Sequence, residues 1–341
     1  MSERPPEEPD PAIRDFVGRL GLVADPEHAR FIALTGGVSS DIWMVEDDRQ
    51  RFCVKRALAK LRVKADWRAP VERNAYEAAW LKGAAQLAPG WVPKILAEDA
   101  EAGMFAMEYL PRERYRSWKA DLLAGRVDFG VASAVGHRLA KIHSAFAGEP
   151  DAAERFATDA SFHAIRLEPY LIATGRAHPD LAEVLGRLAD RTAGTKRTVV
   201  HGDVSPKNIL VGPNGPVFLD AECAWFGDPA FDLAFCLNHM LLKCLAAPAA
   251  AGVLLGSFRA LASSYLAKVD WEDAGKVEAR AATLLPGLFL ARVDGKSPVE
   301  YVTAETEKER VRHTARRLLT SPSVELQDIA DDWAREIGWC A

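Results

Sequence analysis

The chain has 341 residues, of which 49% are hydrophobic and 27% are charged. This is the composition of a soluble globular protein with one large domain or two smaller ones. A net charge of −5 gives no reason to expect nucleic-acid binding. The five cysteines include no CxxC pair, which argues against zinc and disulfide frameworks and favours the cytoplasm.

The first elements in chain order are a tail and a helix. Residues 1–11 are rich in Glu and Pro and contain no apolar segment, which predicts a disordered tail and not a signal peptide. Apolar residues then recur with helical spacing over 12–23.

Short apolar runs separated by polar turns follow and predict an antiparallel sheet. The expected strands are 31–35, 42–46, 51–57, 92–97 and 104–109. A helix is expected between the third and fourth strands, from near Pro70 to about Gln86, because Pro is favoured at the first helical position. The order is therefore β-β-β-α-β-β, within a first lobe at 12–109.

The rest of the chain is expected to be mostly helical. Residues 110–114 are predicted to be a hinge, and 115–341 a second lobe with helices at 131–146, 164–173 and 179–189 and beyond Phe231. The most apolar region, 241–266, is interrupted by Lys243, Pro248 and Arg259, which favours a buried helix pair over a membrane span.

The run His201-Gly202-Asp203-Val204-Ser205-Pro206-Lys207-Asn208 is the most informative stretch of the chain, and Leu219-Asp220-Ala221-Glu222 follows it. Phosphoryl transfer from a nucleotide needs one Asp that orients the attacking hydroxyl, and an Asn and an Asp that hold Mg²⁺. Asp203, Asn208 and Asp220 stand in the order and approximate spacing of the corresponding kinase elements.

These two motifs, with Phe226-Gly227-Asp228-Pro229 after them, resemble the aminoglycoside phosphotransferase and choline kinase-like family of small-molecule kinases, to which methylthioribose kinases are related. The similarity runs from about residue 30 to about residue 300. It implies an α+β fold of the protein kinase-like bilobal type, with an antiparallel-sheet N-lobe carrying one main helix and a mostly helical C-lobe. It also implies ATP and Mg²⁺ as cofactors, with GTP not excluded.

The resemblance gives the motif residues their expected roles. Asp203 is the expected catalytic base, and Asn208 and Asp220 are expected Mg²⁺ ligands. Glu222 is a further metal ligand, a substrate contact or a solvated loop acid. His201 is expected to support the loop through hydrogen bonds. Asp232 is expected to brace the same loop, and Asp228 to sit in a turn.

A nucleotide site is expected in the first lobe. Lys55 lies in a run similar to the kinase V-A-I-K strand, so it is expected to contact the phosphates of the nucleotide and to pair with a glutamate of the following helix. Glu77 is preferred to Glu72 as that partner, because it lies on the same inward-facing side of the helix as Leu81. The alternative is an ordinary surface strand lysine. Further cofactor-binding residues are expected in the 36–40 loop and at the end of the fifth strand: Gly36, Gly37, Ser39, Ser40, Glu108 and Tyr109. The loop can also be read as a simple hairpin turn.

Cys53 shares a strand face with Lys55, because side chains alternate along a strand. It is expected to face the nucleotide cleft beside the adenine. The alternative is a buried cysteine of the N-lobe core.

The acceptor is expected to be a small molecule with a hydroxyl group, because an apolar helix follows Asp220 closely and leaves no room for an activation segment. Sugars, amino alcohols, nucleoside-derived alcohols and aminoglycosides remain open, although the balanced charge of the C-lobe disfavours a polycation. Arg292, Asp294 and Lys296 either line the acceptor pocket or form an interhelical turn. The competing hypothesis is a catalytically silent nucleotide-binding module. Neither nucleic acid nor a membrane is an expected partner, and the oligomeric state stays open.

Overall fold

The computed structural model describes residues 8–34, 40–58, 60 and 71–339. The chain divides into two compact units. Unit 1 comprises Met1–Arg114 and Asp220–Cys223, and unit 2 comprises Tyr115–Leu219 and Ala224–Ala341. The division between them falls at the end of the segment predicted as a hinge, 110–114.

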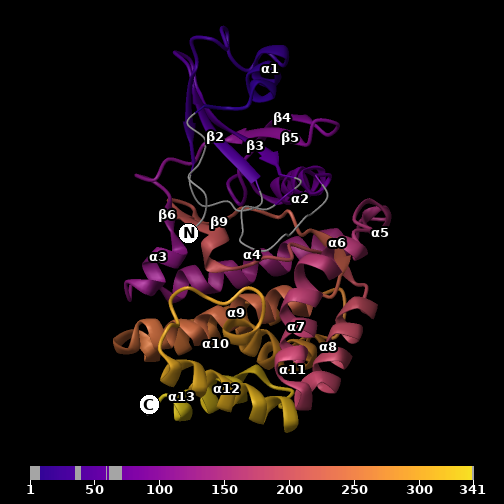
Figure 1. The fold of residues 1–341 in the computed structure, drawn as a ribbon, viewed down its shortest axis with the longest axis vertical. Coiled ribbons are helices and arrows are strands. Elements are labelled where there is room, and N and C mark those ends of the chain that lie inside the picture. Colours follow the sequence, from indigo (N-terminus) through magenta and orange to yellow (C-terminus); the bar gives the residue numbers. More distant parts are fainter. Residues whose placement is uncertain (1–7, 35–39, 59, 61–70, 340–341) are drawn as a thin grey trace. The chain divides into compact units, whose positions relative to one another are not determined.

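Unit 1 is built on a five-stranded antiparallel sheet with the strand order β1-β2-β3-β5-β4 (Figure 1). Its strands are β1 (Arg30–Ala33), β2 (Ser40–Glu46), β3 (Arg51–Ala57), β4 (Ile95–Asp99) and β5 (Met104–Glu108). Its helices are α1 (Pro11–Arg19) and α2 (Arg73–Leu87), so the predicted order β-β-β-α-β-β is present.

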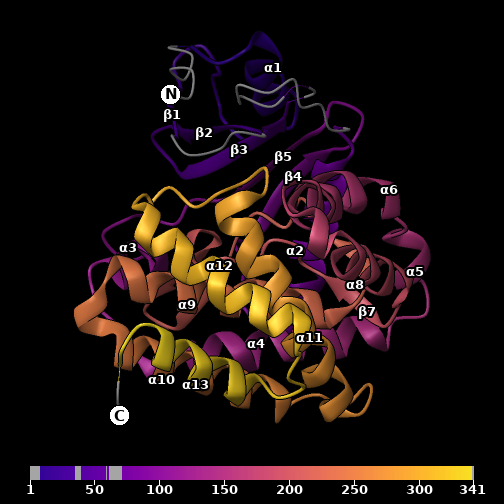
Figure 2. The same cartoon turned by 60° about the horizontal axis from the view of Figure 1, so that its bottom comes forward.

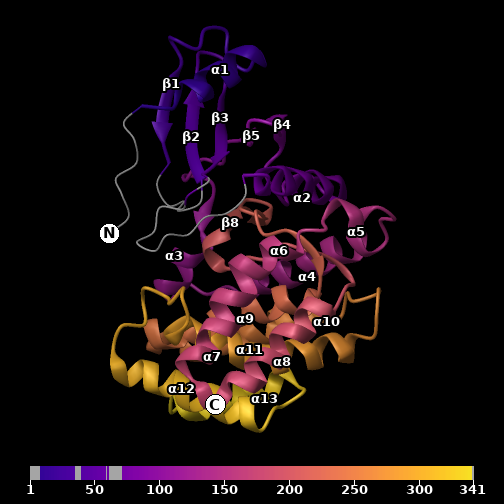
Figure 3. The same cartoon turned by 45° about the vertical axis from the view of Figure 1, so that its right-hand side comes forward.

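The two helices of unit 1 cover opposite faces of this sheet (Figure 3). On one face, Phe16 and Val17 of α1 pack with Trp43, Phe52 and Val54 in a buried apolar cluster. The intervening strand residues face α2 because side chains alternate along a strand. One face of the sheet is therefore apolar, and the opposite face can hold polar side chains.

Local sequence explains where α1 begins. The side chain of Asp10 accepts a hydrogen bond from the backbone amide of Ala12, and Pro11 occupies the first turn. Of the segment predicted as a disordered tail, residues 1–7 lie outside the described residues. Pro70, the predicted start of α2, also lies outside them.

Unit 2 is mostly helical. Its longer helices are α4 (Phe129–Ala147), α8 (Ala182–Gly194), α9 (Pro229–Ala246), α10 (Ala251–Leu266), α11 (Ala274–Asp294), α12 (Glu305–Thr320) and α13 (Leu326–Glu336). Shorter helical segments are α3 (Trp118–Leu123), α5 (Ala152–Arg155), α6 (Asp159–Phe162), α7 (Ala173–Ala177), η2 (Pro179–Leu181), η3 (Pro206–Asn208) and η4 (Pro248–Ala250). Unit 2 also contains two small sheets. One has the strands β6 (Arg116–Ser117), β8 (Ile209–Gly212) and β9 (Gly215–Phe218), and the other has β7 (Thr198–Val200) and β10 (Trp225–Gly227).

Helix α9 is the centre of unit 2, and all of its residues except the last are buried. Helices α10 and α11 pack against it, and α12 and α13 lie over α11 and α10 (Figure 2). The segment Pro248–Leu266 has the length and apolar composition of a membrane span, but half of it is buried inside the protein. This agrees with the buried helix pair predicted for 241–266.

The helix predicted at 164–173 is a π-helix, η1 (His163–Ile172), with Pro169 inside it. Proline has no N–H to donate to the preceding turn, which favours a widened turn over regular α-helix.

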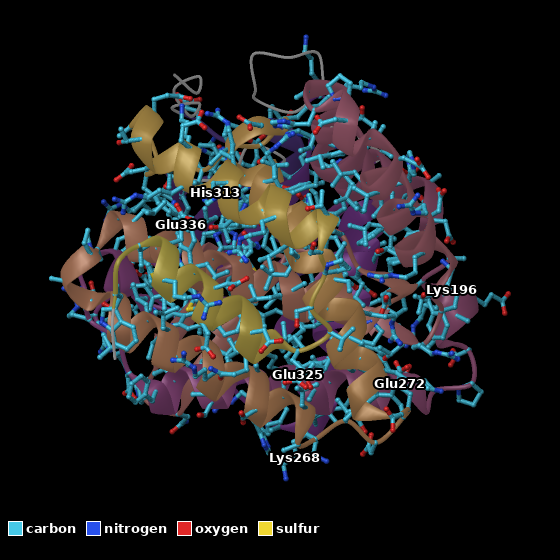
Figure 4. The ribbon with its side chains drawn as sticks, turned by 90° about the horizontal axis from the view of Figure 1, so that it is seen from below. Lys196, Lys268, Glu272, His313, Glu325 and Glu336 are labelled. Atoms are coloured by element: carbon cyan, nitrogen blue, oxygen red, sulfur yellow. The ribbon has the colours of Figure 1, made fainter. Side chains whose placement is uncertain are left out.

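A side-chain hydrogen bond joins two outer helices of unit 2. His313 Nδ1 of α12 lies 2.7 Å from Glu336 Oε2 of α13, and both residues are labelled in Figure 4.

Candidate active site

Unit 1 carries a buried lysine that contacts two acids. Lys55 on β3 and Glu77 on α2 are each 1% exposed, and Lys55 Nζ lies 2.7 Å from Glu77 Oε2. Lys55 also forms an ion pair with Asp220. Glu72 is exposed at the start of α2. The neighbouring acid Glu222 accepts from Arg73 Nε at 3.0 Å.

The charges of this cluster are strongly coupled. Burial alone would lower the pKa of Lys55, but the carboxylates of Asp220, Glu77 and Glu222 outweigh it and raise that pKa, so Lys55 is charged. Burial raises the pKa of Glu77 to about 8, although the charge of Lys55 acts in the opposite direction. The cluster therefore holds three carboxyl groups against the two cations Lys55 and Arg73.

Asp220 has a left-handed backbone conformation, with φ of 67°. Among the described residues it is the one non-glycine residue with a positive φ. Asp tolerates this region better than most residues, at a cost of about 1–3 kcal/mol. In this conformation the Asp220 carboxylate contacts Lys55.

In unit 2, one buried carboxylate holds the loop that follows β7. Asp232, in the first turn of α9, accepts from the backbone amides of His201 at 2.7 Å and Gly202 at 2.8 Å. His143 Nε2 lies 3.1 Å from the same carboxylate. Gly202 has φ of 77°, which explains why glycine stands there. Asp232 thus makes the bracing contacts expected from the sequence.

His201 also stabilises the loop with both ring nitrogens. Its Nδ1 accepts from the Asp203 amide at 3.1 Å, so its Nε2 donates to Leu219 O at 3.0 Å. The ring links the loop to the strand end that precedes Asp220.

Asp203 is fixed by its neighbours and is only 6% exposed. Asn208 Nδ2 donates to both its backbone oxygen and its Oδ2, each at 3.0 Å. Arg166 on η1 and Lys207 lie 3.1 and 3.3 Å from Oδ2. The carboxylate is therefore held in one orientation beside two cations.

Asp203 lines a cavity of about 200 Å³ in unit 2. The cavity is polar and mixes acids, bases and aromatic rings. Its other lining residues are Lys119, Tyr170, Ser205, Pro206, Lys207, Phe235, His239, Lys243, Arg292, Ser297, Pro298, Glu300 and Tyr301. A larger hollow of about 550 Å³ between α12 and α13 contains none of the predicted site residues.

A family model described as "Phosphotransferase enzyme family" matches residues 30–271. The chain belongs to this family. It is 24% identical over 255 residues to a methylthioribose kinase of Bacillus pumilus, an alignment that covers 67% of this chain. The chain spans 64% of the length of that curated relative.

Solved structures confirm the protein kinase-like fold of the chain. An amicoumacin kinase, solved with AMP-PNP and Ca²⁺, matches with a TM-score of 0.56 and 12% identity over 93% of this chain and 96% of its own. A choline kinase from Streptococcus pneumoniae matches with a TM-score of 0.53 and 17% identity over 91% and 98%. At these identities the similarity concerns the fold alone.

The predicted nucleotide-binding residues are only partly described. Gly36, Gly37 and Ser39 lie outside the described residues. Ser40 is buried at the start of β2, and its hydroxyl has no hydrogen-bond partner within the described ranges. Glu108 is exposed at the end of β5, where its carboxylate accepts weakly from Lys94 N at 3.3 Å, and Tyr109 is half-buried after it.

The residues predicted to bind the acceptor have different surroundings from one another. Arg292 lines the cavity beside Asp203. Asp294 instead binds Arg312 at 2.7 Å and His178 at 2.8 Å, and Lys296 binds Glu168 at 2.7 Å.

The donors of the predicted metal site suit Mg²⁺ chemically. Because Asn208 uses its Nδ2 to bind Asp203, its amide oxygen is the group left for a cation. Asp220 and Glu222 add hard carboxylate oxygens, the type that Mg²⁺ prefers. Asn208 belongs to unit 2 and the two acids to unit 1. Within the described part of the chain, no three His, Cys, Asp or Glu residues form a ready metal cage.

Sequence reasoning missed several residues around Asp203. Lys207 was visible inside the motif, but no role was assigned to it. Arg166 had no signal, because it lies 37 residues before Asp203 on a segment without a motif. His239 and Lys243 were hidden in the apolar sequence of α9, and Tyr301 contacts them only through the fold.

Proposed function

We propose that this phosphotransferase transfers the terminal phosphoryl group of ATP to a hydroxyl group of a small molecule, with Mg²⁺. The observation that carries the proposal is the position of Asp203, a carboxylate fixed by Asn208 and open to a polar cavity. A kinase of the same fold that was solved with AMP-PNP supports the choice of nucleotide.

In the proposed reaction the acceptor hydroxyl donates a hydrogen bond to Asp203. Its oxygen forms a bond to the terminal phosphorus of ATP while the bond from that phosphorus to ADP breaks, and the proton passes to Asp203. Lys55, kept charged by its acids, binds phosphate oxygens of the nucleotide. Arg166 and Lys207 orient the Asp203 carboxylate.

Mg²⁺ would be held by Asn208, Asp220 and Glu222 and would neutralise charge on the phosphates. The absence of a ready three-residue cage among the described residues fits a metal that shares its coordination with phosphates and water. No disulfide joins the four cysteines within the described residues, which supports a reducing cytoplasm as the site of the reaction.

The test is a panel of hydroxylated metabolites incubated with ATP and Mg²⁺, with ADP formation as the readout. Acceptor-dependent ADP formation that disappears in Asp203→Asn supports the proposal. Nucleotide binding by a folded protein that forms no acceptor-dependent ADP would favour the silent binding module instead.

A further inference from the structure

The cavity beside Asp203 contains more positive than negative side chains. Four cations line it, and two carboxylates, Asp203 and Glu300, oppose them. The four cations are Lys119, Lys207, Lys243 and Arg292. A bound molecule would therefore meet an excess of positive charge.

Two of these cations are paired with the two carboxylates. Lys119 forms an ion pair with Glu300, and Lys207 lies 3.3 Å from Asp203 Oδ2. Lys243 and Arg292 form no ion pair with any carboxylate of the described ranges. They are the cations left for a ligand.

Lys243 is deeply buried, with 1% exposure. Its Nζ lies 3.3 Å from the Tyr301 hydroxyl and 4.8 Å from the centre of the Tyr301 ring. An ammonium that is removed from water without a counter-ion is costly, so its charge is easily lost. Burial, with Lys119 and Arg292 nearby, lowers the pKa of Lys243 to about 7.

His239 lies one turn before Lys243 on the same face of α9. Its Nδ1 is 3.2 Å from the Tyr301 hydroxyl. In the tautomer of the neutral ring that carries its proton on Nε2, Nδ1 accepts from the Tyr301 hydroxyl and Nε2 is a donor. Nε2 is buried and has no partner within the described residues.

Arg292 presents a further unsatisfied donor. Its NH1 donates to Tyr170 and Ser297 at 3.0 Å, whereas its buried Nε has no partner among the described residues. Lys243, Arg292 and His239 thus supply hydrogen-bond donors from three side chains and no acceptor. An unsatisfied buried donor is unfavourable until a ligand binds it.

We propose that the acceptor is a hydroxylated acid, whose carboxylate or phosphate group binds Lys243, Arg292 and His239 while its hydroxyl reaches Asp203. This rests on the proposed phosphoryl transfer and adds the class of the acceptor. Arginine and lysine form their strongest hydrogen bonds with such anions. A polycationic aminoglycoside or a quaternary ammonium alcohol would be repelled by the same residues.

The first experiment uses binding alone. Thermal unfolding is followed with increasing inorganic phosphate, acetate or gluconate, and with choline as the cationic probe. Saturable stabilisation by the anions is expected in the natural protein, and it is expected to be lost in Lys243→Met and in Arg292→Met. The controls are Lys268→Met and Arg187→Met, which change exposed residues outside the cavity; Figure 4 labels Lys268.

An anion effect that is absent, or equal in Lys243→Met and Lys268→Met, would overturn the proposal whatever the enzyme does with ATP. Circular dichroism and ATP affinity show whether each variant is folded. Because the binding test needs no turnover, its failure is separate from a failure to form ADP.

The second experiment compares acceptors with matched skeletons. One set is glucose, gluconate and glucosamine, and the other is glycerol, glycerate and glycerol 3-phosphate. We expect the acids to exceed the neutral and amino compounds in kcat/KM by about tenfold to a hundredfold, the effect of one or two charge-assisted hydrogen bonds. Glycerate against glycerol 3-phosphate separates carboxylate from phosphate. A preference for the neutral or amino member in both sets would overturn the acid proposal and leave phosphoryl transfer intact.

Discussion

Two lysines of this protein are equally buried but have opposite surroundings. Lys55 in unit 1 and Lys243 in unit 2 are each 1% exposed. Lys55 is surrounded by Glu77, Asp220 and Glu222, which raise its pKa, whereas no carboxylate of the described residues pairs with Lys243, and burial lowers its pKa. Burial alone therefore does not decide whether a lysine is charged; the neighbouring acids do.

The difference indicates two kinds of ligand site. Unit 1 offers a cation whose charge is maintained before any ligand arrives, together with carboxylates in excess. Unit 2 offers Lys243, which we expect to be stabilised in its protonated form when an anionic ligand binds. The predictions below test this contrast in order of decreasing effect.

The largest effect is expected at Asp203, the proposed catalytic base. Asp203→Asn keeps the shape and removes the base, so kcat should fall by about 10²–10⁴-fold. ATP affinity, measured by calorimetry, should stay within about twofold because unit 1 is untouched. Near-normal turnover would remove Asp203 from the chemistry.

The two lysines should respond oppositely to removal. Lys55→Met leaves Glu77 buried without its cation and should lower the free energy of unfolding by about 3–5 kcal/mol. Lys243→Met removes an ammonium without an acid and should leave stability unchanged or raised. Denaturant unfolding of both variants measures this, and equal destabilisation would break the comparison.

The pH dependence sharpens the same contrast. The pKa of Lys243 falls from 10.5 to about 7 on folding, so the unfolded chain binds the extra proton between these values. The stabilisation by Lys243→Met should therefore be greatest below pH 7 and vanish towards pH 10.5. A constant difference across this range would contradict the lowered pKa.

Metal dependence should separate the predicted ligands from their neighbours. Asn208→Ala and Asp220→Ala each remove one hard oxygen, and should raise the Mg²⁺ concentration required for half-maximal activity by about tenfold, an interaction of roughly 1.4 kcal/mol. Asp294→Ala is the control, since that acid binds Arg312 and His178. Unchanged Mg²⁺ titrations in both variants would exclude these ligands.

Anion binding should weaken as pH rises. The affinity of gluconate, measured by calorimetry without nucleotide, should fall by up to about tenfold per pH unit above 7 as Lys243 loses its proton. The groups around Lys243 are Tyr301, His239, Cys236, Lys119, Arg292 and Glu300. Burial keeps His239, Cys236 and Tyr301 neutral in this range. Lys243→Met should flatten the profile.

The smallest effect concerns Cys53, which is 5% exposed on the strand face of Lys55. Burial raises its pKa to about 12, so alkylation should be slow even without ATP. If it faces the nucleotide, saturating ATP should slow its labelling further, with Cys223, Cys236 and Cys244 as internal controls in mass spectrometry. Labelling at an unchanged, measurable rate would place Cys53 in the N-lobe core instead.

The sequence predicts those parts of the structure that are set by short-range patterns. The alternation of side chains along the strand of Lys55 and the inward-facing side of α2 predict the buried pair of Lys55 and Glu77. The spacing of Asp203 and Asn208 predicts that the two residues lie close together, and a hydrogen bond joins them. The fold class follows from the order of strands and helices and is confirmed.

The remainder depends on long-range packing. Lys243 reads as an interruption in an apolar segment, and nothing local indicates that Tyr301, 58 residues later, covers it. Arg292 and Asp294 are close in sequence but lie on different sides of α11, so one lines the cavity and the other an ion-pair network. Helical periodicity also cannot distinguish the π-helix at 163–172 from an α-helix.

Because the Asp232 carboxylate binds the catalytic loop, local unfolding of that loop is linked to local unfolding of the central helix α9. The amide protons of His201 and Gly202 are bound to a side chain that is anchored in the first turn of α9. Amide hydrogens exchange with solvent only when such bonds open. We therefore expect hydrogen exchange at these two amides to be as slow as in the helical core, in contrast to an ordinary surface loop.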